Sequence, residues 1–170
     1  MRSYKIALTQ LALVVFVFFI GSSDSYGRPR VHAAGGTHLY VLLGLGNNSP
    51  GLSEFGSRMQ QRGIPTTIAN HGEMPALAQE AIAQYKAGRL RAIEIVGHSL
   101  GGDAAVAMAA ELGNAGVPVQ LVVTLDPNGS SAVSPNVRRA VNFVPRAGED
   151  HSTMIVARER DIGRYVLGGR

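Results

Sequence analysis

The hydrophobic positions of the chain follow two different patterns. Residues 6–20 form an apolar run that is broken at only two positions and follows a basic start, Arg2 and Lys5. From residue 37 onward, short apolar runs alternate with stretches in which apolar residues recur every three or four positions, and Gly, Pro or Asn separates them. This alternation predicts a repeated strand-helix unit.

The strand-helix repeat predicts a three-layer α/β sandwich with a mainly parallel sheet of about five strands, connected by right-handed crossovers. The nearly continuous apolar runs are typical of strands that are buried on both faces. The expected strands cover residues 38–43, 64–69, 90–96, 117–125 and 140–144. We expect a first helix that is capped by Ser49, begins at Pro50 and stops at Gly63, followed by helices over residues 75–88, 100–112 and 151–167.

Composition narrows the chemistry that the chain can perform. The sequence has 170 residues, within the range of one domain, and no cysteine, which excludes disulfides, thiolate zinc sites and a cysteine nucleophile. Residues 1–33 hold four basic residues and one acid, which leaves 12 basic and 11 acidic residues for the remainder. The net charge of this remainder is close to zero, which argues against nucleic-acid binding.

The first 33 residues predict an export signal, and residues 34–170 form the expected catalytic domain. A helix over residues 6–20 would span roughly 22 Å of a hydrocarbon core that is about 30 Å thick. The short span and the small residues that follow it favour cleavage, after Ser23 or Ala33, over a permanent anchor. We therefore expect an exported, periplasmic or secreted protein, and the alternative is a membrane anchor formed by residues 6–20.

The main chemical signal is the G-x-S-x-G motif Gly97-His98-Ser99-Leu100-Gly101. It joins the end of an expected strand to the start of an expected helix, which is the context that a nucleophile elbow requires. The alternative is a glycine-rich turn with an inert serine. A phosphate-binding loop of the P-loop type does not fit, because no Lys-Ser or Lys-Thr pair follows.

A serine nucleophile needs a base and an acid that orients the base. The one histidine after Ser99 is His151, and Asp126 ends the apolar run 121–125, so it projects from the same sheet edge as Ser99. Glu149 and Asp150 are the rival acids, but a residue so close to His151 in sequence seldom folds back onto its imidazole. The alternatives to catalytic roles are that Asp126 only forms a turn and that His151 only caps a helix.

Two backbone N–H groups are expected to form an oxyanion hole. Leu100, the residue after the serine, supplies one, and Leu45 in the glycine-containing loop after the first strand supplies the other, with Gly46 as the second choice. The other histidines show no paired metal spacing, and His98 fills a variable position of the elbow. We therefore assign no metal and no cofactor.

Four segments, in order along residues 37–162, resemble the α/β-hydrolase superfamily, specifically its compact thioesterase and lipase-like members. They are VLLGLGNN (41–48), IVGHSLGGDAAVAMA (95–109), VTLDP (123–127) and GEDHSTM (148–154). The resemblance implies a reduced α/β-hydrolase fold without a cap domain, with Ser99 as nucleophile, Asp126 as acid and His151 as base.

The expected activity is that of a serine esterase, lipase or thioesterase, which cleaves a small-molecule or lipid-like acyl substrate through an acyl-enzyme on Ser99. Two alternatives remain at this point. An acyltransferase would use the same triad, and a catalytically silent member would use the fold for binding alone.

Overall fold

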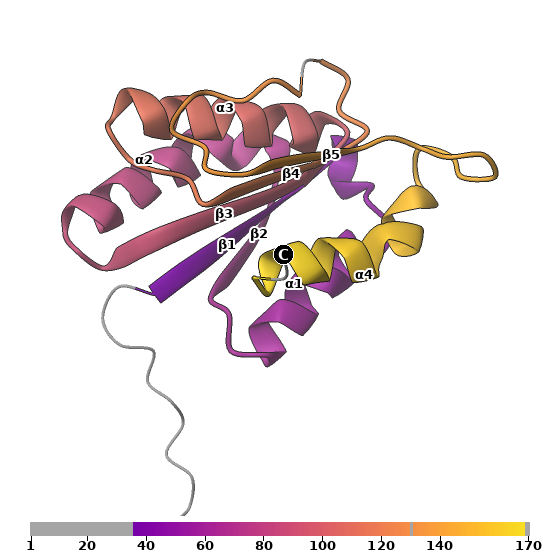
Figure 1. Cartoon of the computed structure of the whole chain (residues 1–170), viewed down its shortest axis with the longest axis horizontal. Helices are drawn as coiled ribbons and strands as arrows, with labels where there is room; N and C mark the ends of the chain where they lie inside the picture. Colours follow the sequence, from indigo (N-terminus) through magenta and orange to yellow (C-terminus); the bar gives the residue numbers. More distant parts are fainter. Residues whose placement is uncertain (1–35, 130, 169–170) are drawn as a thin grey trace, which may run out of the picture. The chain divides into compact units, whose positions relative to one another are not determined.

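A five-stranded parallel sheet lies at the centre of the described part of the chain, residues 36–129 and 131–168 of a computed structural model (Figure 1). The strand order is β2-β1-β3-β4-β5, and each neighbouring pair is parallel. The strands are β1 (Gly36–Leu43), β2 (Thr66–Asn70), β3 (Leu90–His98), β4 (Leu121–Leu125) and β5 (Ala140–Phe143).

The described residues also form four α-helices and two short 3₁₀ turns; the first three helices connect strands, and the fourth follows the last strand. The helices are α1 (Leu52–Gln61), α2 (Met74–Lys86), α3 (Leu100–Asn114) and α4 (Met154–Val166), and the turns are Leu45–Asn47 and His71–Glu73. Helices α2 and α3 cover one face of the sheet, and α1 and α4 cover the other (Figure 1). The predicted three-layer α/β fold with a parallel sheet is therefore confirmed.

The sheet separates two hydrophobic cores because successive side chains of a strand point to opposite faces. Strand β1 sends Leu42 into the core under α2 and α3, and Leu39 and Val41 into the core under α1 and α4. Strand β3 divides in the same way, with Ile95 on the first side and Val96 on the second. Burial on both faces explains why these strands are apolar without alternation.

The predicted start of the first helix is wrong. Helix α1 begins at Leu52, and its N-cap is Gly51, which has a φ of 88°. Ser49 does not cap the helix, because its hydroxyl accepts a hydrogen bond from the Gly44 N–H instead.

A strand and a helix begin at least three residues later than predicted. The expected strand over residues 117–125 is regular only from Leu121, and ahead of it Val119 forms an isolated bridge with Val137. The expected helix over residues 151–167 begins at Met154, because residues 151–153 form a turn before it.

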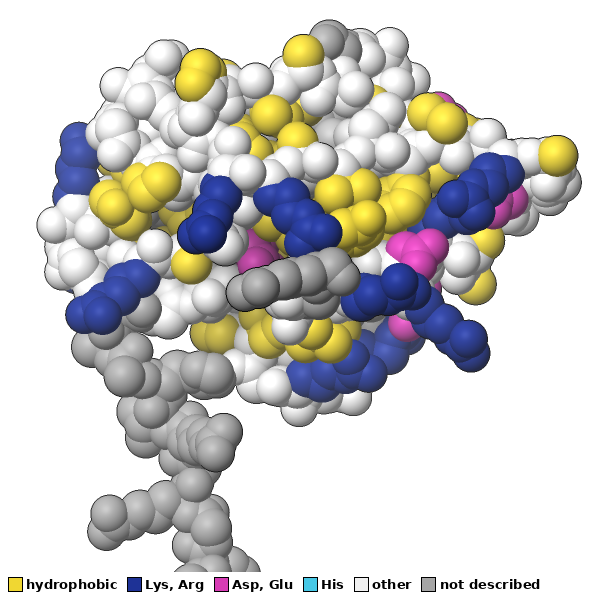
Figure 2. All heavy atoms as spheres, in the orientation of Figure 1, with side chains coloured by type: hydrophobic (Ala, Val, Ile, Leu, Met, Phe, Trp, Pro, Cys, Tyr) yellow, Lys and Arg dark blue, Asp and Glu magenta, His cyan; other side chains and the backbone are white. Residues whose placement is uncertain are grey.

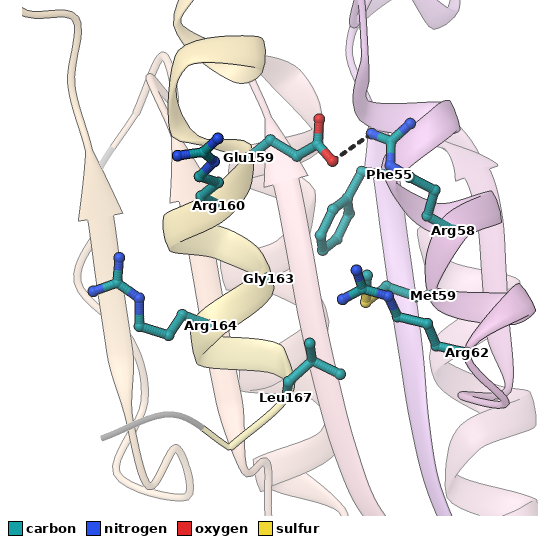
Figure 3. Close-up of a pocket in the computed structure, with 9 residues that line it drawn as sticks. All are labelled: Phe55, Arg58, Met59, Arg62, Glu159, Arg160, Gly163, Arg164 and Leu167. Carbon is teal, nitrogen blue, oxygen red and sulfur yellow. Dashed lines mark ion pairs between the residues drawn. The ribbon is translucent and has the colours of Figure 1, made fainter.

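Helices α1 and α4 meet through an ion pair between Arg58 and Glu159, with 2.7 Å between nitrogen and oxygen (Figure 3). Between these helices lies a hollow of about 370 Å³. Its lining residues are Phe55, Arg58, Met59, Arg62, Glu159, Arg160, Gly163, Arg164 and Leu167. Lys and Arg side chains are prominent on this face of the molecule (Figure 2). None of the predicted site residues lines the hollow.

The predicted leader, residues 1–33, lies outside the described residues. Within the described part of the chain, no helix combines the length and hydropathy that a bilayer crossing requires.

One carboxyl group is buried in the sheet. Glu94 on β3 is only 7% exposed and lies between Leu39 of β1 and Leu121 of β4 in the register. Its Oε2 atom has no hydrogen-bond partner among the described residues. Burial raises the pKa of Glu94 to about 7, since desolvation disfavours the charged form.

The raised pKa of Glu94 predicts that stability falls as the pH rises. The unfolded chain ionises Glu94 near pH 4.5 and the folded chain near pH 7, so between these values the folded state binds more protons. Stability is therefore lost across this window. We expect Glu94→Gln to flatten the pH dependence and to raise the free energy of unfolding at pH 8 by about 1–3 kcal/mol.

Urea unfolding at pH 5 and pH 8 measures this effect of Glu94. The exposed Glu54→Gln is the matched control and should follow the wild-type pH dependence. Equal pH dependence in wild type and Glu94→Gln would contradict the prediction.

Candidate active site

Ser99 occupies a strained turn between β3 and α3. Its φ and ψ are 56° and −127°, a left-handed conformation that is uncommon for a residue with a side chain. Backbone hydrogen bonds hold the turn, because the Ser99 N–H donates to the Leu125 carbonyl (2.9 Å) and the Ser99 carbonyl accepts from the Gly102 N–H (2.8 Å). The Ser99 side chain therefore leaves the end of β3 in a fixed direction at the start of α3.

The glycines on either side of Ser99 are required by close backbone contacts. A Cβ atom at Gly97 would lie 2.0 Å from the Gly101 carbonyl oxygen. A Cβ atom at Gly101 would lie 2.0 Å from the carbonyl oxygen of Leu42 on β1. Any side chain at these positions would push the strand and the helix apart. The two glycines of the G-x-S-x-G motif therefore have a steric basis.

Asp126 and His151 form a hydrogen-bonded pair. Asp126 directly follows β4, and its own φ is 44°, with its N–H donating to the Phe143 carbonyl (2.8 Å). Its Oδ2 lies 2.7 Å from His151 Nδ1, and the side chains of Asp126 and His151 are 32% and 44% exposed. Because a carboxylate accepts, His151 Nδ1 carries the proton in this pair, and the lone pair of the neutral ring is on Nε2.

The two rival acids have other partners. Glu149 Oε2 lies 2.7 Å from Nη2 of the buried Arg158 and accepts from the Arg146 N–H. Asp150 Oδ1 accepts the N–H groups of Ser152 and Thr153 (2.9 and 2.8 Å) and so holds the turn before α4.

The same bonds act on the charge of Asp150. Hydrogen bonds from Thr153, and then from Ser152, hold the pKa of Asp150 below its usual value. The structure therefore brings Asp126, and neither rival, to the His151 ring.

The loop after β1 lies against the turn at Ser99. A Cβ atom at Gly44 would lie 3.3 Å from Ser99 Cβ, so a residue larger than glycine would press on the serine. The Gly44 N–H is occupied by Ser49 Oγ at 2.9 Å. The next residue, Leu45, has a 71% exposed side chain, and its N–H has no hydrogen-bond partner in the described residues.

Leu100 is the first residue of α3, where a helix leaves its N–H groups unbonded. Its N–H has no acceptor within residues 36–129 and 131–168. Both N–H groups that the sequence predicts for an oxyanion hole are therefore free of acceptors among the described residues. The second choice, Gly46, lies inside the 3₁₀ turn with a φ of 59°.

His98 was assigned no role from the sequence, yet it has two side-chain hydrogen bonds and is fully buried. Its Nδ1 lies 3.0 Å from Ser49 Oγ, and its Nε2 lies 2.8 Å from the carbonyl oxygen of His151. The signal that could have found it is a polar residue at the end of a strand that is otherwise buried. Its partners come from positions 49 and 53 residues away, which the sequence does not connect.

In the part of the chain that the structure describes, neither the Ser99 hydroxyl nor His151 Nε2 has a hydrogen-bond partner. For Ser99 and His151 to act as nucleophile and base, a hydrogen bond between them would have to form when a substrate binds, as it does in many enzymes whose free site is loose. Among the described residues, no group of three or more His, Asp or Glu side chains is placed to hold a metal ion.

No protein-family model matches the chain, and no curated protein sequence matches it. The geometry of Ser99, Asp126 and His151 is therefore the basis for inferring a function.

Proposed function

We propose that the chain is a serine hydrolase that cleaves a carboxylic ester or thioester through an acyl-enzyme on Ser99. The observation that supports this proposal most strongly is the 2.7 Å hydrogen bond between Asp126 and His151, formed by residues 25 positions apart, beside a serine in a strained turn. Backbone strain persists only where surrounding structure enforces it, and it gathers at reactive sites. A glycine-rich turn with an inert serine would have no need of this strain.

In the first step, the Ser99 oxygen attacks the carbonyl carbon of the acyl substrate while His151 Nε2 takes the hydroxyl proton. Asp126 holds the imidazole in the tautomer that can accept this proton and stabilises the imidazolium that results. The negative charge that develops on the carbonyl oxygen is stabilised by the N–H groups of Leu100 and Leu45. The N-terminus of α3 adds a favourable dipole at the same place.

Collapse of the tetrahedral intermediate breaks the bond to the leaving group, and His151 returns its proton to the departing alcohol or thiol. Water then gives a proton to His151 as its oxygen attacks the acyl-serine. The carboxylic acid leaves, Ser99 regains its proton, and the cycle balances without a cofactor.

The substrate is an acyl compound that reaches an open site. The partial exposure of His151 and Asp126 and the exposed Leu45 side chain support direct access from solvent. In the sequence, only 26 residues lie between Ser99 and Asp126, and only 24 lie between Asp126 and His151. These intervals have no room for a cap domain, so we place the chain among the compact, thioesterase-like or lipase-like α/β-hydrolases that its motifs resemble.

We further propose that residues 1–33 direct export and are removed. The apolar run over residues 6–20 is short for a membrane span, and small residues follow it. N-terminal sequencing of the secreted protein should find a start near Asp24 or Ala34. Intact Met1 in a membrane fraction that resists extraction by high salt would instead show an anchor.

Covalent labelling tests the serine hydrolase proposal. A fluorophosphonate should react once per chain at Ser99, because His151 activates that hydroxyl. Ser99→Ala should abolish labelling, and Ser57→Ala is the control, since that serine lies within α1 and its hydroxyl donates to the Ser53 carbonyl. Failure of the wild-type protein to react, while it remains folded, would favour a silent binding protein.

Asparagine substitutions test which carboxylate orients His151. Asp126→Asn should lower kcat toward an activated ester by about 10³–10⁴-fold with little change in KM, because the wrong histidine tautomer is then favoured. Asp150→Asn should change kcat by less than about threefold, since Asp150 bonds only backbone and Thr153. Steady-state kinetics on matched preparations gives the ranking, and the opposite order would assign the acid to Asp150.

A further inference from the structure

His98 connects two loops that the proposed reaction needs. It ends β3, immediately before Ser99, and its side chain is 0% exposed. On one side it contacts Ser49, which bonds to the Gly44 N–H beside the oxyanion-hole residue Leu45. On the other side it bonds to the backbone carbonyl of His151, and the two imidazole rings lie 4.5 Å apart between centroids.

The partners fix the positions of the protons on this network. A backbone carbonyl can only accept, so His98 Nε2 must carry a proton that it donates to His151 (2.8 Å). In a neutral ring Nδ1 then accepts, so the Ser49 hydroxyl donates to it (3.0 Å) and accepts in turn from the Gly44 N–H (2.9 Å). The direction of each of the three hydrogen bonds from Gly44 to His151 is therefore fixed.

The network requires His98 to be neutral. Burial lowers the pKa of His98, against the opposing effect of its hydrogen bond to the His151 carbonyl. A charged His98 would also repel the His151 imidazolium that forms during the proposed reaction, since the rings are in contact. A neutral His98 supports the backbone of His151 without opposing that charge.

We propose that His98, together with Ser49, is a positioning residue that holds the backbone of the base His151 and the oxyanion loop at Gly44 in one hydrogen-bonded network. This inference rests on the proposed hydrolase function for its kinetic consequences. The network acts through backbone groups. His98 determines the position of the His151 backbone, and Ser49 determines how the Gly44 peptide faces Ser99. A displacement of about 1 Å in either can cost about 10²-fold in rate.

The kinetic test uses the full chain and an activated ester. His98→Leu removes both bonds, and we expect kcat to fall by about 10–100-fold with KM changed less than about threefold. His98→Gln keeps a donor that can reach the His151 carbonyl, and should recover kcat to within about fivefold of wild type. Ser49→Ala frees the Gly44 N–H and should lower kcat while leaving the base in place.

The matched control is His38→Leu. His38 lies on β1 and bonds to Thr67 through Nε2 at 2.8 Å, so its loss removes a histidine from the same sheet at a distance from Ser99. It should lower the melting temperature without lowering kcat. A similar fall in kcat for His38→Leu and His98→Leu, or no recovery in His98→Gln, would reduce His98 to a structural residue and overturn the inference.

Nitrogen-15 histidine NMR of the wild-type chain tests the network independently of any activity. We expect His98 at pH 7 to be neutral, with the proton on Nε2 and with Nδ1 as a hydrogen-bond acceptor that shifts in Ser49→Ala. A proton on Nδ1, or a charged ring at pH 7, would overturn the inference even if the chain is a hydrolase. If the signals are as expected but Ser99-dependent activity is absent, the network stands and the proposed function fails.

Discussion

The turn at Ser99 is the constraint on which the candidate site depends. Its left-handed backbone brings the end of β3 and the start of α3 so close together that Gly97 and Gly101 have no space for a side chain. The Leu42 carbonyl on β1 closes the same space from the neighbouring strand. Two parallel strands and one helix thus define a single position for the Ser99 side chain. The backbone strain at Ser99 is offset by the stabilisation that comes from burying the elements around it.

The parallel sheet explains why the other site residues arrive at this position. Parallel strands end at one edge, so the loop after β1, the turn after β3 and Asp126 after β4 all leave the sheet on the same side. The segment after β5 then brings His151 across to Asp126. The candidate site is therefore made of residues that are distant in sequence but follow strand ends, which is how α/β proteins commonly build their sites.

Much of this arrangement follows from the sequence, because the underlying signals are local. Apolar runs and glycine punctuation predict each strand and helix, and the motif around Ser99 predicts a strand before it and a helix after it. Asp126 is recognisable because it ends a buried strand. The predicted helix start, with Ser49 as the cap, is wrong for a physical reason. Serine is a good cap, but here the Ser49 hydroxyl bonds to the buried His98 and to the Gly44 N–H instead of to the helix.

His98 and Glu94 show what a single sequence leaves hidden. Both are polar residues on a buried strand, and their roles depend on what the tertiary fold puts beside them. His98 finds Ser49 and the His151 carbonyl, whereas Glu94 Oε2 finds no partner in the described residues and Glu94 has a raised pKa. No spacing rule distinguishes these two outcomes, since the partners of His98 lie on distant segments and Glu94 Oε2 has none among the residues that the structure describes.

The most direct test of the account is to trap the acyl-enzyme. The protein is mixed with a p-nitrophenyl ester, quenched in acid within the first turnover, and measured by intact mass and peptide mapping, over a series of acyl chain lengths. The account predicts a mass increase of one acyl group per chain, located on Ser99 and absent in Ser99→Ala. An acyl group on another residue, or ester turnover that survives Ser99→Ala, would contradict it.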